Sequence, residues 1–342
     1  MSGIDAVIAW VDGTDPAHAA KRALFAQDAS ASYAEAVENT RFVESGEIYF
    51  CIASILKYAP FIQNIWLITD RQTPRLLGNF ILDGLCEPGR IRVVDHQEIF
   101  SGYEDLLPTF NSRSIEAILW RIPGLSERFI YFNDDMMLLA ALEESDFFDH
   151  EHIVFYADRM VQHDRLMKVR LRKLLRRLTG RKPRNRSSMQ MASDISSRLV
   201  GEYRYSLVPR HQPHPLRVSI QRSFYGSRID ILRRQISYRF RNQDQFLPIS
   251  LAYLLEMQAG NGPQHRQDHV LGYVDARQPS AWLDFDRALA SDAKFLCLQS
   301  LDEGSRAFQE HANRELHRRF AGYCPAELSE RAVDGECHAS MA

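Results

Sequence analysis

An apolar run that stops at one amide and two carboxylates contains the residue types that bear most directly on chemistry. Residues 129–132 are apolar or aromatic, and Asn133, Asp134 and Asp135 follow them. At the carboxyl end of a strand in an α/β sheet, such side chains lie at the edge where ligands bind. Adjacent carboxylates repel each other unless a cation or protons neutralise them, so the pair predicts a hard-metal site and phosphate chemistry. The alternative interpretation is that Asp134 and Asp135 cap the N-terminus of a helix.

Three further apolar runs also stop at an aspartate. They are residues 4–12, 64–70 and 90–95, which end at Asp12, Asp70 and Asp95. Near-continuous apolar runs are typical of strands buried on both faces, as in parallel sheets. The recurrence predicts an acidic edge whose carboxylates line one crevice.

Other polar residues beside these runs could contact a ligand. Asp12 and Gly13 form a strand-to-turn unit in which glycine lets a ligand approach the backbone, and the alternative is ordinary turn chemistry. Trp10 belongs either to the core or to a surface on which a base stacks. Asn111 and Ser112 open a predicted helix, where an N-cap and phosphate binding are compatible. Further side chains that could grip a nucleotide or sugar hydroxyls are Arg41, Glu47, Asp70 and Gln72.

Two later segments carry groups suited to proton transfer and phosphate binding. His211 and His214 lie in a proline-framed loop far from any cysteine, which favours acid–base use or phosphate contact over zinc binding. Arg239 and Arg241, with Asp244 orienting an arginine, could clamp phosphate oxygens. The alternative is an ordinary surface ion pair.

The patterns along the chain alternate between strand and helix. Helical spacing of apolar residues predicts helices over 48–58 and 115–122, and apolar runs predict later strands at 152–157 and 294–299. This alternation predicts an α/β fold with a Rossmann-like, mostly parallel sheet flanked by helices, a helical insertion and a helical C-terminal region. The expected parts are an α/β part at 1–160, a basic helical insertion at 161–210, a helical part with the late strand at 211–302, and a C-terminal helix and tail at 303–342.

Bulk properties narrow the class of protein. The chain has 342 residues, a formal net charge of −2 and 45% hydrophobic residues, so it can build a sizeable core and shows no global attraction to nucleic acid. Its five cysteines form no C-x-x-C pair, which indicates free thiols in a reducing compartment. We find no signal peptide, no apolar run of membrane-spanning length, and no P-loop, dinucleotide-binding or nucleophile-elbow motif. A cytoplasmic location is expected.

Residues 165–186 form a strongly basic segment. It contains eleven Lys or Arg residues and no acidic one, with leucines on one helical face. Such a helix could lie on an anionic membrane surface or hold an anionic glycan or nucleic acid. The alternative is a solvated helix that packs by its leucine face.

Four segments of the sequence resemble, in order, four conserved blocks of the Stealth family of sugar-1-phosphate transferases. This family includes bacterial capsule polymerases and the animal lysosomal-enzyme N-acetylglucosamine-1-phosphotransferase. The family's first block resembles residues 4–16, and its second resembles residues 41–149, most closely at 69–74, 107–112, 121–126 and 129–135. The third is similar to 211–215 with Arg239, Arg241 and Asp244, and the fourth to 294–298. Four blocks in order make a specific match.

The sequence departs from the family pattern at two points. The family usually has Leu-Arg-Ser in its first helix, where this chain has Ile52, Ala53 and Ser54. After the fourth block the family usually has Asn-Asp, where this chain has Gln299 and Ser300. The ligand contacts at both points differ accordingly.

The resemblance implies a nucleotide-sugar donor, such as a UDP-sugar, and a glycan acceptor in cell-surface polysaccharide synthesis. An acceptor hydroxyl attacks the sugar-linked phosphorus, UMP leaves, and a phosphodiester forms. We expect Asp134 or Asp135 to ligate Mg²⁺ (or Mn²⁺), Arg241 to neutralise the transferring phosphate, and Asp12 or His211 to act as the base. The residues of the donor and substrate site are expected to be Trp10, Gly13, Arg41, Glu47, Asp70, Gln72, Asn111, Ser112, Asn133, Arg239 and Asp244.

Two alternatives remain at this point. A metal-dependent nucleotide-sugar glycosyltransferase would use a similar donor site but release UDP. A degenerate, non-catalytic glycan- or nucleotide-binding protein would fit the departures at Ala53, Gln299 and Ser300.

Overall fold

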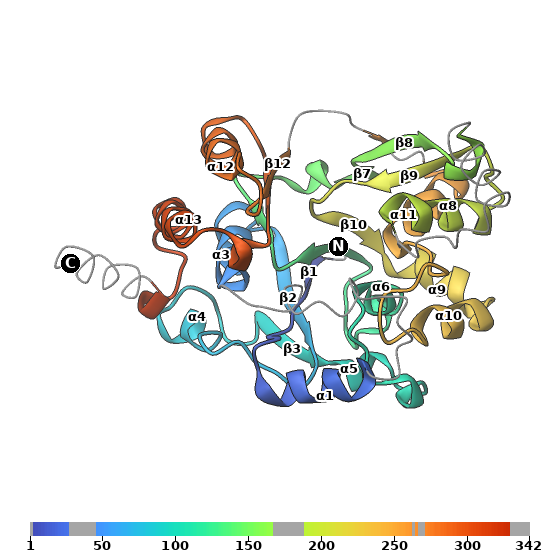
Figure 1. Cartoon of the computed structure of the whole chain (residues 1–342), viewed down its shortest axis with the longest axis horizontal. Helices are drawn as coiled ribbons and strands as arrows, with labels where there is room; N and C mark the ends of the chain where they lie inside the picture. Colours follow the sequence, from blue (N-terminus) through green and yellow to red (C-terminus); the bar gives the residue numbers. More distant parts are fainter. Residues whose placement is uncertain (1–2, 27–45, 167–187, 262–263, 266–270, 329–342) are drawn as a thin grey trace, which may run out of the picture.

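A five-stranded sheet forms the centre of the computed structural model, which describes residues 3–26, 46–166, 188–261, 264–265 and 271–328. The strand order is β10-β4-β1-β2-β3 (Figure 1). Strands β1 to β4 pair in parallel, and β10 pairs antiparallel with β4 at the edge. The strands are β1 (Ile4–Ala9), β2 (Ile62–Thr69), β3 (Ile91–Asp95), β4 (Arg128–Asn133) and β10 (His214–Arg217). The predicted mostly parallel α/β sheet is therefore confirmed.

The sheet has a topological switch point between β1 and β4. From β1 the chain builds β2 and β3 on one side and then returns to add β4 on the other. The carboxyl ends of β1 and β4 thus border the crevice at which open α/β sheets bind ligands. This is where the sequence places Trp10 and Asn133.

A buried aspartate fixes the opposite end of the central strands. Asp5, fully buried in β1, accepts hydrogen bonds from the indole Nε1 of Trp66 at 2.9 Å and from the backbone N of Ser126 at 2.9 Å. Its other oxygen accepts two more from Asn64. Four donors compensate the burial of this carboxylate and hold β1 against both neighbours.

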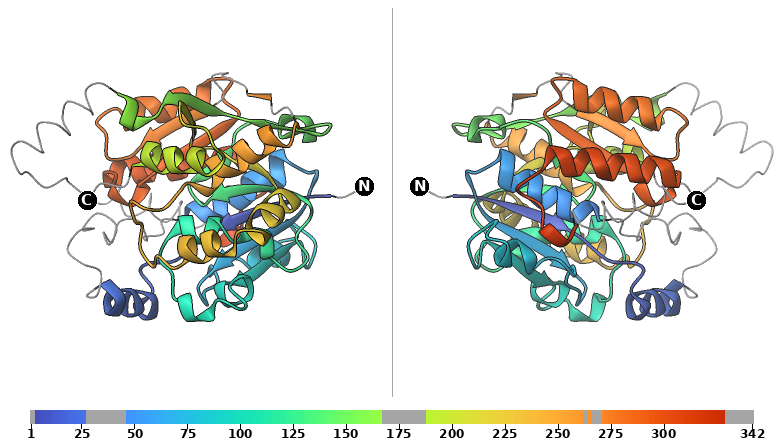
Figure 2. Two further views of the ribbon diagram at one scale, coloured as in Figure 1. Left: turned by 90° about the vertical axis from the view of Figure 1, so that its right-hand side faces the viewer. Right: turned by 90° about the vertical axis from the view of Figure 1, so that its left-hand side faces the viewer.

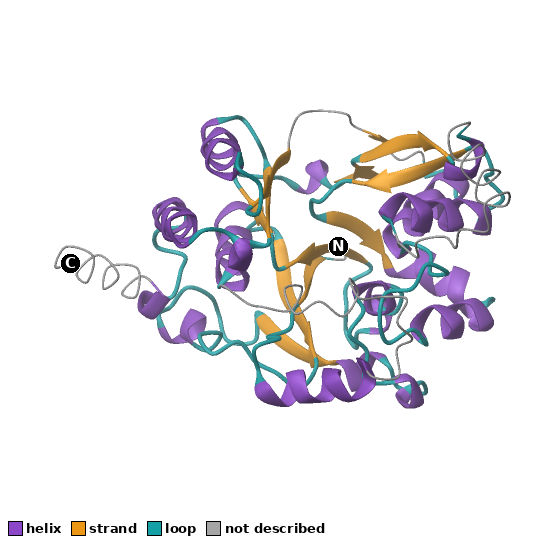
Figure 3. Ribbon diagram, viewed as in Figure 1, coloured by secondary structure: helices purple, strands orange, loops and turns teal. Residues whose placement is uncertain are grey.

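In the described part of the chain, helices and three smaller sheets surround the central sheet (Figures 2 and 3). The longer helices are α1 (Pro16–Ala26), α3 (Glu47–Tyr58), α8 (Met189–Leu199), α9 (Val218–Gly226), α10 (Ile229–Ile236), α11 (Pro248–Gln258), α12 (Ala281–Ala290) and α13 (Arg306–Arg319). The short helices are α4 (Asn79–Leu82), α5 (His96–Ile99) and α6 (Ser112–Glu116). The remaining strands are β5 (Met136–Leu138), β6 (Phe148–Asp149), β7 (His152–Phe155), β8 (Ala157–Val161), β9 (Tyr205–Pro209), β11 (Gln264–His265), β12 (Leu271–Asp275) and β13 (Phe295–Gln299).

Two differences between the predicted and the observed elements concern the helix before β4 and the strand beside it. The helix expected over 115–122 ends at Glu116, and a short 3-10 turn at Leu119–Arg121 follows. Strand β10 was not predicted, because Pro215 made its sequence look like a loop. An edge strand tolerates proline, since one side of its backbone has no ladder to donate to.

Three of the later elements are confirmed, whereas strand β9 lies in the part of 161–210 that was expected to be helical. Strand β13 and helix α13 correspond to the expected late strand and terminal helix, and β7 to the strand expected near 152–157. Residues 167–187 lie outside the described residues, so the predicted basic helix of 165–186 and its membrane or polyanion contact stay predictions. The flanking part of 161–210 packs as α8 against β9 and α11.

Two further expectations concern cysteines and membranes. Cys51, Cys86, Cys297 and Cys324 are all free thiols, as predicted. The fifth, Cys337, is outside the described residues. Throughout the part of the chain that the structure describes, every helix is too short or too polar to cross a bilayer.

Candidate active site

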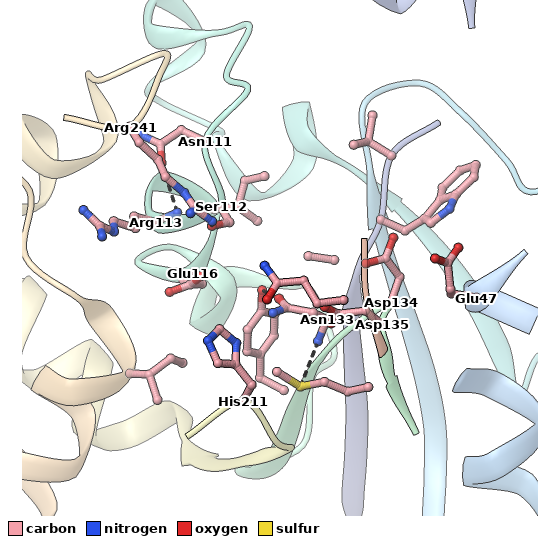
Figure 4. Close-up of a pocket in the computed structure, with 18 of the residues that line it drawn as sticks. Glu47, Asn111, Ser112, Arg113, Glu116, Asn133, Asp134, Asp135, His211 and Arg241 are labelled. Atoms are coloured by element: carbon pink, nitrogen blue, oxygen red, sulfur yellow. Dashed lines mark hydrogen bonds between the residues drawn. The ribbon is translucent and has the colours of Figure 1, made fainter. Parts of the chain in front are cut away.

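A cavity of about 460 Å³ opens at the carboxyl ends of β1 and β4. Its lining comes from segments far apart in the chain: the ends of β1, β3 and β4, helix α6, and the loops before β10 and after α10. Figure 4 shows arginines on one side and a carboxylate pair on the other, with an imidazole below them. The predicted site residues that line it are Trp10, Glu47, Asn111, Ser112, Asn133, Asp134, Asp135, His211 and Arg241.

The carboxylate pair lies in a tight turn between two strands. Asp134 and Asp135 connect β4 to β5, and β5 pairs with β13 instead of continuing as a helix. The alternative that they cap a helix is therefore wrong. Asn133, just before the pair, accepts a hydrogen bond at Oδ1 from the hydroxyl of buried Tyr131 at 2.8 Å. The turn thus presents both carboxylates to the cavity from a fixed backbone.

Asp135 is poorly compensated by the surrounding protein. Its Oδ1 is buried and has no hydrogen-bond partner among the described residues. Its Oδ2 receives the weak donor Sγ of Cys297, 3.5 Å away. Burial raises the pKa of Asp135 from 3.8 to about 6, although the hydrogen bond from Cys297 opposes the rise. An orphan carboxylate oxygen facing a cavity is suited to a hard cation.

The opposite side of the cavity carries positive charge around a buried carboxyl group. Arg241 donates from Nη2 to Oγ of Ser112 at 3.0 Å. Glu116 lines the cavity beneath them, and its Oε2 is buried without a hydrogen-bond partner in the described part of the chain. Burial raises the pKa of Glu116, and the nearby charges of Arg241 and Arg113 partly oppose this. The carboxyl group of Glu116 and the guanidinium group of Arg241 thus compensate each other's charge only in part, so both can still bind a ligand.

Asn111 supports this side of the cavity. Its side-chain oxygen accepts from the backbone N of Arg113 at 3.2 Å, so it is the N-cap of α6, as expected. Its Nδ2 donates to Oε1 of Gln245 at 2.8 Å and to the backbone oxygen of Tyr238 at 3.0 Å. These bonds tie α6 to the segment that carries Arg241, which fixes Arg241 relative to Glu116.

The two histidines of the proline-framed loop have different surroundings. His211 is half-buried at the cavity wall, with its ring 5.5 Å from that of Tyr273. Burial, and then the charge of Arg241, lower the pKa of His211 below 6.5, so the ring is neutral at pH 7. His214 is buried with Nδ1 2.8 Å from the hydroxyl of Tyr253, and burial lowers its pKa to about 3. His211 is therefore the better placed to exchange a proton with a ligand.

Six predicted residues do not line the cavity. Oδ1 of Asp12 accepts from the backbone N of Thr14 at 2.8 Å in a turn, while Gln72 bridges the backbone of Asp12. Asp70 pairs with Lys21 at 2.8 Å. Arg239 donates to backbone oxygens, and exposed Asp244 forms no ion pair with either predicted arginine in the described chain. The six are Asp12, Gly13, Asp70, Gln72, Arg239 and Asp244.

The remaining predicted residue, Arg41, lies outside the described residues.

The structure also adds cavity residues that the sequence analysis did not single out. Arg113 and Glu116 were absorbed into a predicted helix stripe, although a charged pair three residues apart inside an apolar helix was a usable signal. Arg210 and Arg277 also line the cavity, each paired with an aspartate.

The residues present fit a divalent cation only with help from the substrate. Within the described residues, no group of three or more His, Cys, Asp or Glu side chains is arranged to hold a metal ion. Mg²⁺ is commonly bound by one or two carboxylates together with substrate phosphates and water. Asp134 and the orphan oxygen of Asp135 match that smaller requirement.

Comparison with known proteins adds to this geometry. Residues 3–26 match the model of Stealth protein conserved region 1, and residues 41–155 match that of conserved region 2. In these two regions the chain is similar to the Stealth family. They supply the β1 end, Glu116 and the carboxylate pair, whereas His211 and Arg241 lie beyond them.

Curated relatives have related names. The chain is 36% identical over 204 residues to the capsular polysaccharide phosphotransferase cps12A of Actinobacillus pleuropneumoniae, covering 59% of this chain and 49% of that protein. It is 38% identical over 148 residues to the exopolysaccharide phosphotransferase cps2G of Lactiplantibacillus plantarum, covering 43% and 40%. The chain thus spans about half or less of the length of these relatives.

Solved structures show a weaker likeness. The WbbM bifunctional glycosyltransferase aligns with a TM-score of 0.43 and 11% identity, over 96% of this chain and 52% of that one. Mouse xyloside xylosyltransferase 1 aligns with a TM-score of 0.36 and 10% identity, over 87% of this chain and 98% of that one. Scores this low carry no functional inference.

Proposed function

We propose that this protein is a phosphotransferase of the Stealth family that moves sugar-1-phosphate from a nucleotide-sugar, in particular a UDP-sugar, to a hydroxyl of a glycan acceptor. The product is a phosphodiester, and UMP is released. The observation that carries this proposal is the convergence of Asp135, Arg241, Glu116 and His211 on one cavity at the switch point of the sheet. The names of the curated relatives support phosphate transfer to polysaccharide.

The carboxylate pair and Arg241 would bind the charged diphosphate of the donor from two sides of the cavity. A divalent cation, when bound at Asp134 and Asp135, would neutralise oxygens of the diphosphate. Arg241 lies across the cavity, where Ser112 fixes its guanidinium at 3.0 Å. There it can neutralise the phosphate that is transferred, and a preoriented donor of this kind typically lowers the barrier by about 3–4 kcal/mol.

His211 would accept the proton of the acceptor hydroxyl. The hydroxyl oxygen forms a bond to the sugar-linked phosphorus, the bond from that phosphorus to the bridging oxygen breaks, and UMP leaves with the bridging oxygen. Because the ring of His211 is neutral at pH 7, it can take the proton without first losing one. Asp12 does not line the cavity, so we assign the base to His211 in preference to Asp12.

Glu116 would hold the arginine side in place. Its buried carboxyl group lies near the charges of Arg241 and Arg113. A negative charge there keeps two guanidinium groups together that would otherwise repel each other. We therefore treat Glu116 as a positioning residue for Arg241.

The test is the identity of the released nucleotide. The purified protein is incubated with a panel of UDP-sugars, Mg²⁺ and candidate glycan acceptors, and UMP is separated from UDP. Acceptor-dependent UMP with a phosphodiester in the product is expected, and it should be lost in Asp134→Asn and Arg241→Met. The surface variant Asp284→Asn, whose carboxylate pairs only with Arg287 on α12 among the described residues, is the matched control.

The same experiment separates the competing functions. Release of UDP would identify a metal-dependent glycosyltransferase instead and would overturn the proposal. Nucleotide binding without any release, unchanged in Asp135→Asn, would identify a non-catalytic binding protein.

A further inference from the structure

One arm of the cavity is chemically unlike the rest. It is lined by His18 of α1, His96 at the start of α5, and Thr109 and Phe110 just before α6; we call these four residues the neutral arm. Helices α1 and α5 lie beside each other at the lower edge of Figure 1. The mechanism proposed above uses none of the four.

Two polar atoms of the neutral arm are buried without partners. His96 is 4% exposed and Thr109 is 1% exposed. Nδ1 of His96 and Oγ1 of Thr109 have no hydrogen-bond partner anywhere in the described chain, and the same holds for Nε1 of Trp10, which also lines the cavity. Leaving such an atom unsatisfied costs about 1–3 kcal/mol, so a ligand that supplies the missing hydrogen bonds is favoured.

Aromatic rings form the wall beside these atoms. The ring of Phe110 lies 5.4 Å from that of His18 in an edge contact, and Phe240 stacks on it at 5.2 Å. Both neighbours fix the ring of Phe110, so the wall is rigid. A rigid aromatic wall with buried polar atoms beside it is typical of a site for a flat heterocycle.

The residues that line this arm carry no charge at pH 7. Burial lowers the pKa of His96 to about 4 and also lowers that of His18, so both imidazoles are neutral at pH 7. The cations whose charges act on His18 are Arg22 and Lys21 of α1, and Lys21 is paired with Asp70. The opposite side of the cavity carries Arg241 instead. The cavity is thus divided into a neutral aromatic arm and a charged part, as a neutral base joined to an anionic diphosphate requires.

We propose that the neutral arm binds the nucleobase of a nucleoside diphosphate, with Thr109 and His96 hydrogen-bonding to the edge of the base. This inference rests on the proposed function for the identity of the donor. A hydroxyl and a neutral imidazole can each donate or accept, so together they match the alternating acceptors and donor on a uracil edge. Phe110 and His18 supply the apolar wall.

The test compares ligands that have and lack a base. Binding of UDP and of inorganic pyrophosphate to the full chain is measured by calorimetry in Mg²⁺, for the wild-type protein and for Thr109→Val and Thr109→Ser. Valine keeps the shape of threonine but removes the hydroxyl, whereas serine keeps the hydroxyl. We expect Thr109→Val to weaken UDP about tenfold and Thr109→Ser to retain it, with pyrophosphate unchanged in both.

A second variant protects the test against misfolding. His96→Phe removes the ring nitrogens while it preserves an aromatic ring, and it should likewise weaken UDP but not pyrophosphate. A variant that binds pyrophosphate normally has an intact cavity. Equal losses for the two ligands, unchanged UDP affinity in both Thr109→Val and His96→Phe, or wild-type protein that binds UDP no better than pyrophosphate, would overturn the inference.

The outcome is independent of the transfer assay. UDP binding that depends on Thr109, without any UMP release, would refute the proposed function and leave the base site standing. UMP release by the wild-type protein, together with unchanged UDP affinity in Thr109→Val and His96→Phe, would refute the base site alone.

Discussion

Replacing Asp135 by asparagine is expected to make the protein more stable while it removes activity. A rise in the pKa of this carboxyl group from 3.8 to about 6 means that the folded protein holds the proton more tightly than the unfolded chain. Each unit of difference between the folded and the unfolded pKa is worth about 1.4 kcal/mol, so the ionised carboxylate lowers the free energy of unfolding by about 3 kcal/mol at pH 8. Because the unfolded state loses the proton first, stability falls as the pH rises through the window between 3.8 and about 6.

The gain in Asp135→Asn should therefore depend on pH. It should reach about 3 kcal/mol at pH 8 and about half of that at pH 5, where the folded carboxyl group is still mostly protonated. The amide has a burial cost of its own, but this cost is the same at both pH values, so the difference of about 1.5 kcal/mol is the sharper quantity.

Urea unfolding at pH 5 and pH 8 measures the free energy of unfolding of Asp135→Asn relative to wild type, with Asp284→Asn as the control for the loss of one surface charge. Thermal shift with UDP and Mg²⁺ gives a second readout, since the ligands should stabilise the wild-type protein and not Asp135→Asn. A variant that is less stable than wild type by the same amount at both pH values would refute the reasoning, because it would mean that Asp135 is well paired in the fold.

Other expectations follow from the same contacts. His211→Ala should lower kcat about 10²–10³-fold, and the acid limb of kcat against pH should lie below pH 6.5 in the wild-type protein. Arg241→Met should raise the pKa of His211, followed by NMR of its ring, because the charge of Arg241 lowers that pKa. Near-normal turnover of His211→Ala would exclude it as the base. Arg217→Met should lower the free energy of unfolding by about 3–5 kcal/mol in urea, since it leaves the carboxylate of Glu256, whose side chain is 2% exposed and 3.3 Å from Arg217, without the charge that pairs with it, although the hydrogen bond from Asn261 stays; a cost below about 1 kcal/mol would contradict this. Chelation by EDTA should abolish UMP release and Mg²⁺ or Mn²⁺ should restore it; release that persists in EDTA would contradict a metal at Asp134 and Asp135.

The central sheet could be predicted from the sequence because most of its strands are buried on both faces. Parallel strands covered on both faces need apolar residues at nearly every position, so β1, β2 and β4 stand out from their surroundings. Strand β10 did not, since it lies at the edge and contains Pro215. Its register against β4 is set by tertiary pairing, which no local pattern displays.

The acidic edge was predicted only in part. All four strand ends carry an aspartate, but three of these side chains bind other protein groups instead of lining the cavity. Asp12 accepts from Thr14, Asp70 pairs with Lys21, and Asp95 caps α5. Position at a strand end was predictable, whereas the choice between these contacts and the cavity depends on neighbours that the fold brings in.

Glu116 shows the opposite error. Local periodicity assigned it to an ordinary helix, and its role comes from Arg241, which lies 125 positions away in sequence. No alternation or spacing near residue 116 contains that information.

The antiparallel edge strand β10 has a consequence for biosynthesis. When the ribosome has made β4, the strand that will cover its outer edge is still about 80 residues from being translated, a delay of about 4–16 s at 5–20 residues per second. During this interval β4, whose residues 129–132 are apolar or aromatic, has an open edge, to which another nascent chain can pair. Fragments that stop at residue 155, where the matched family region ends, would make this exposure permanent and should aggregate.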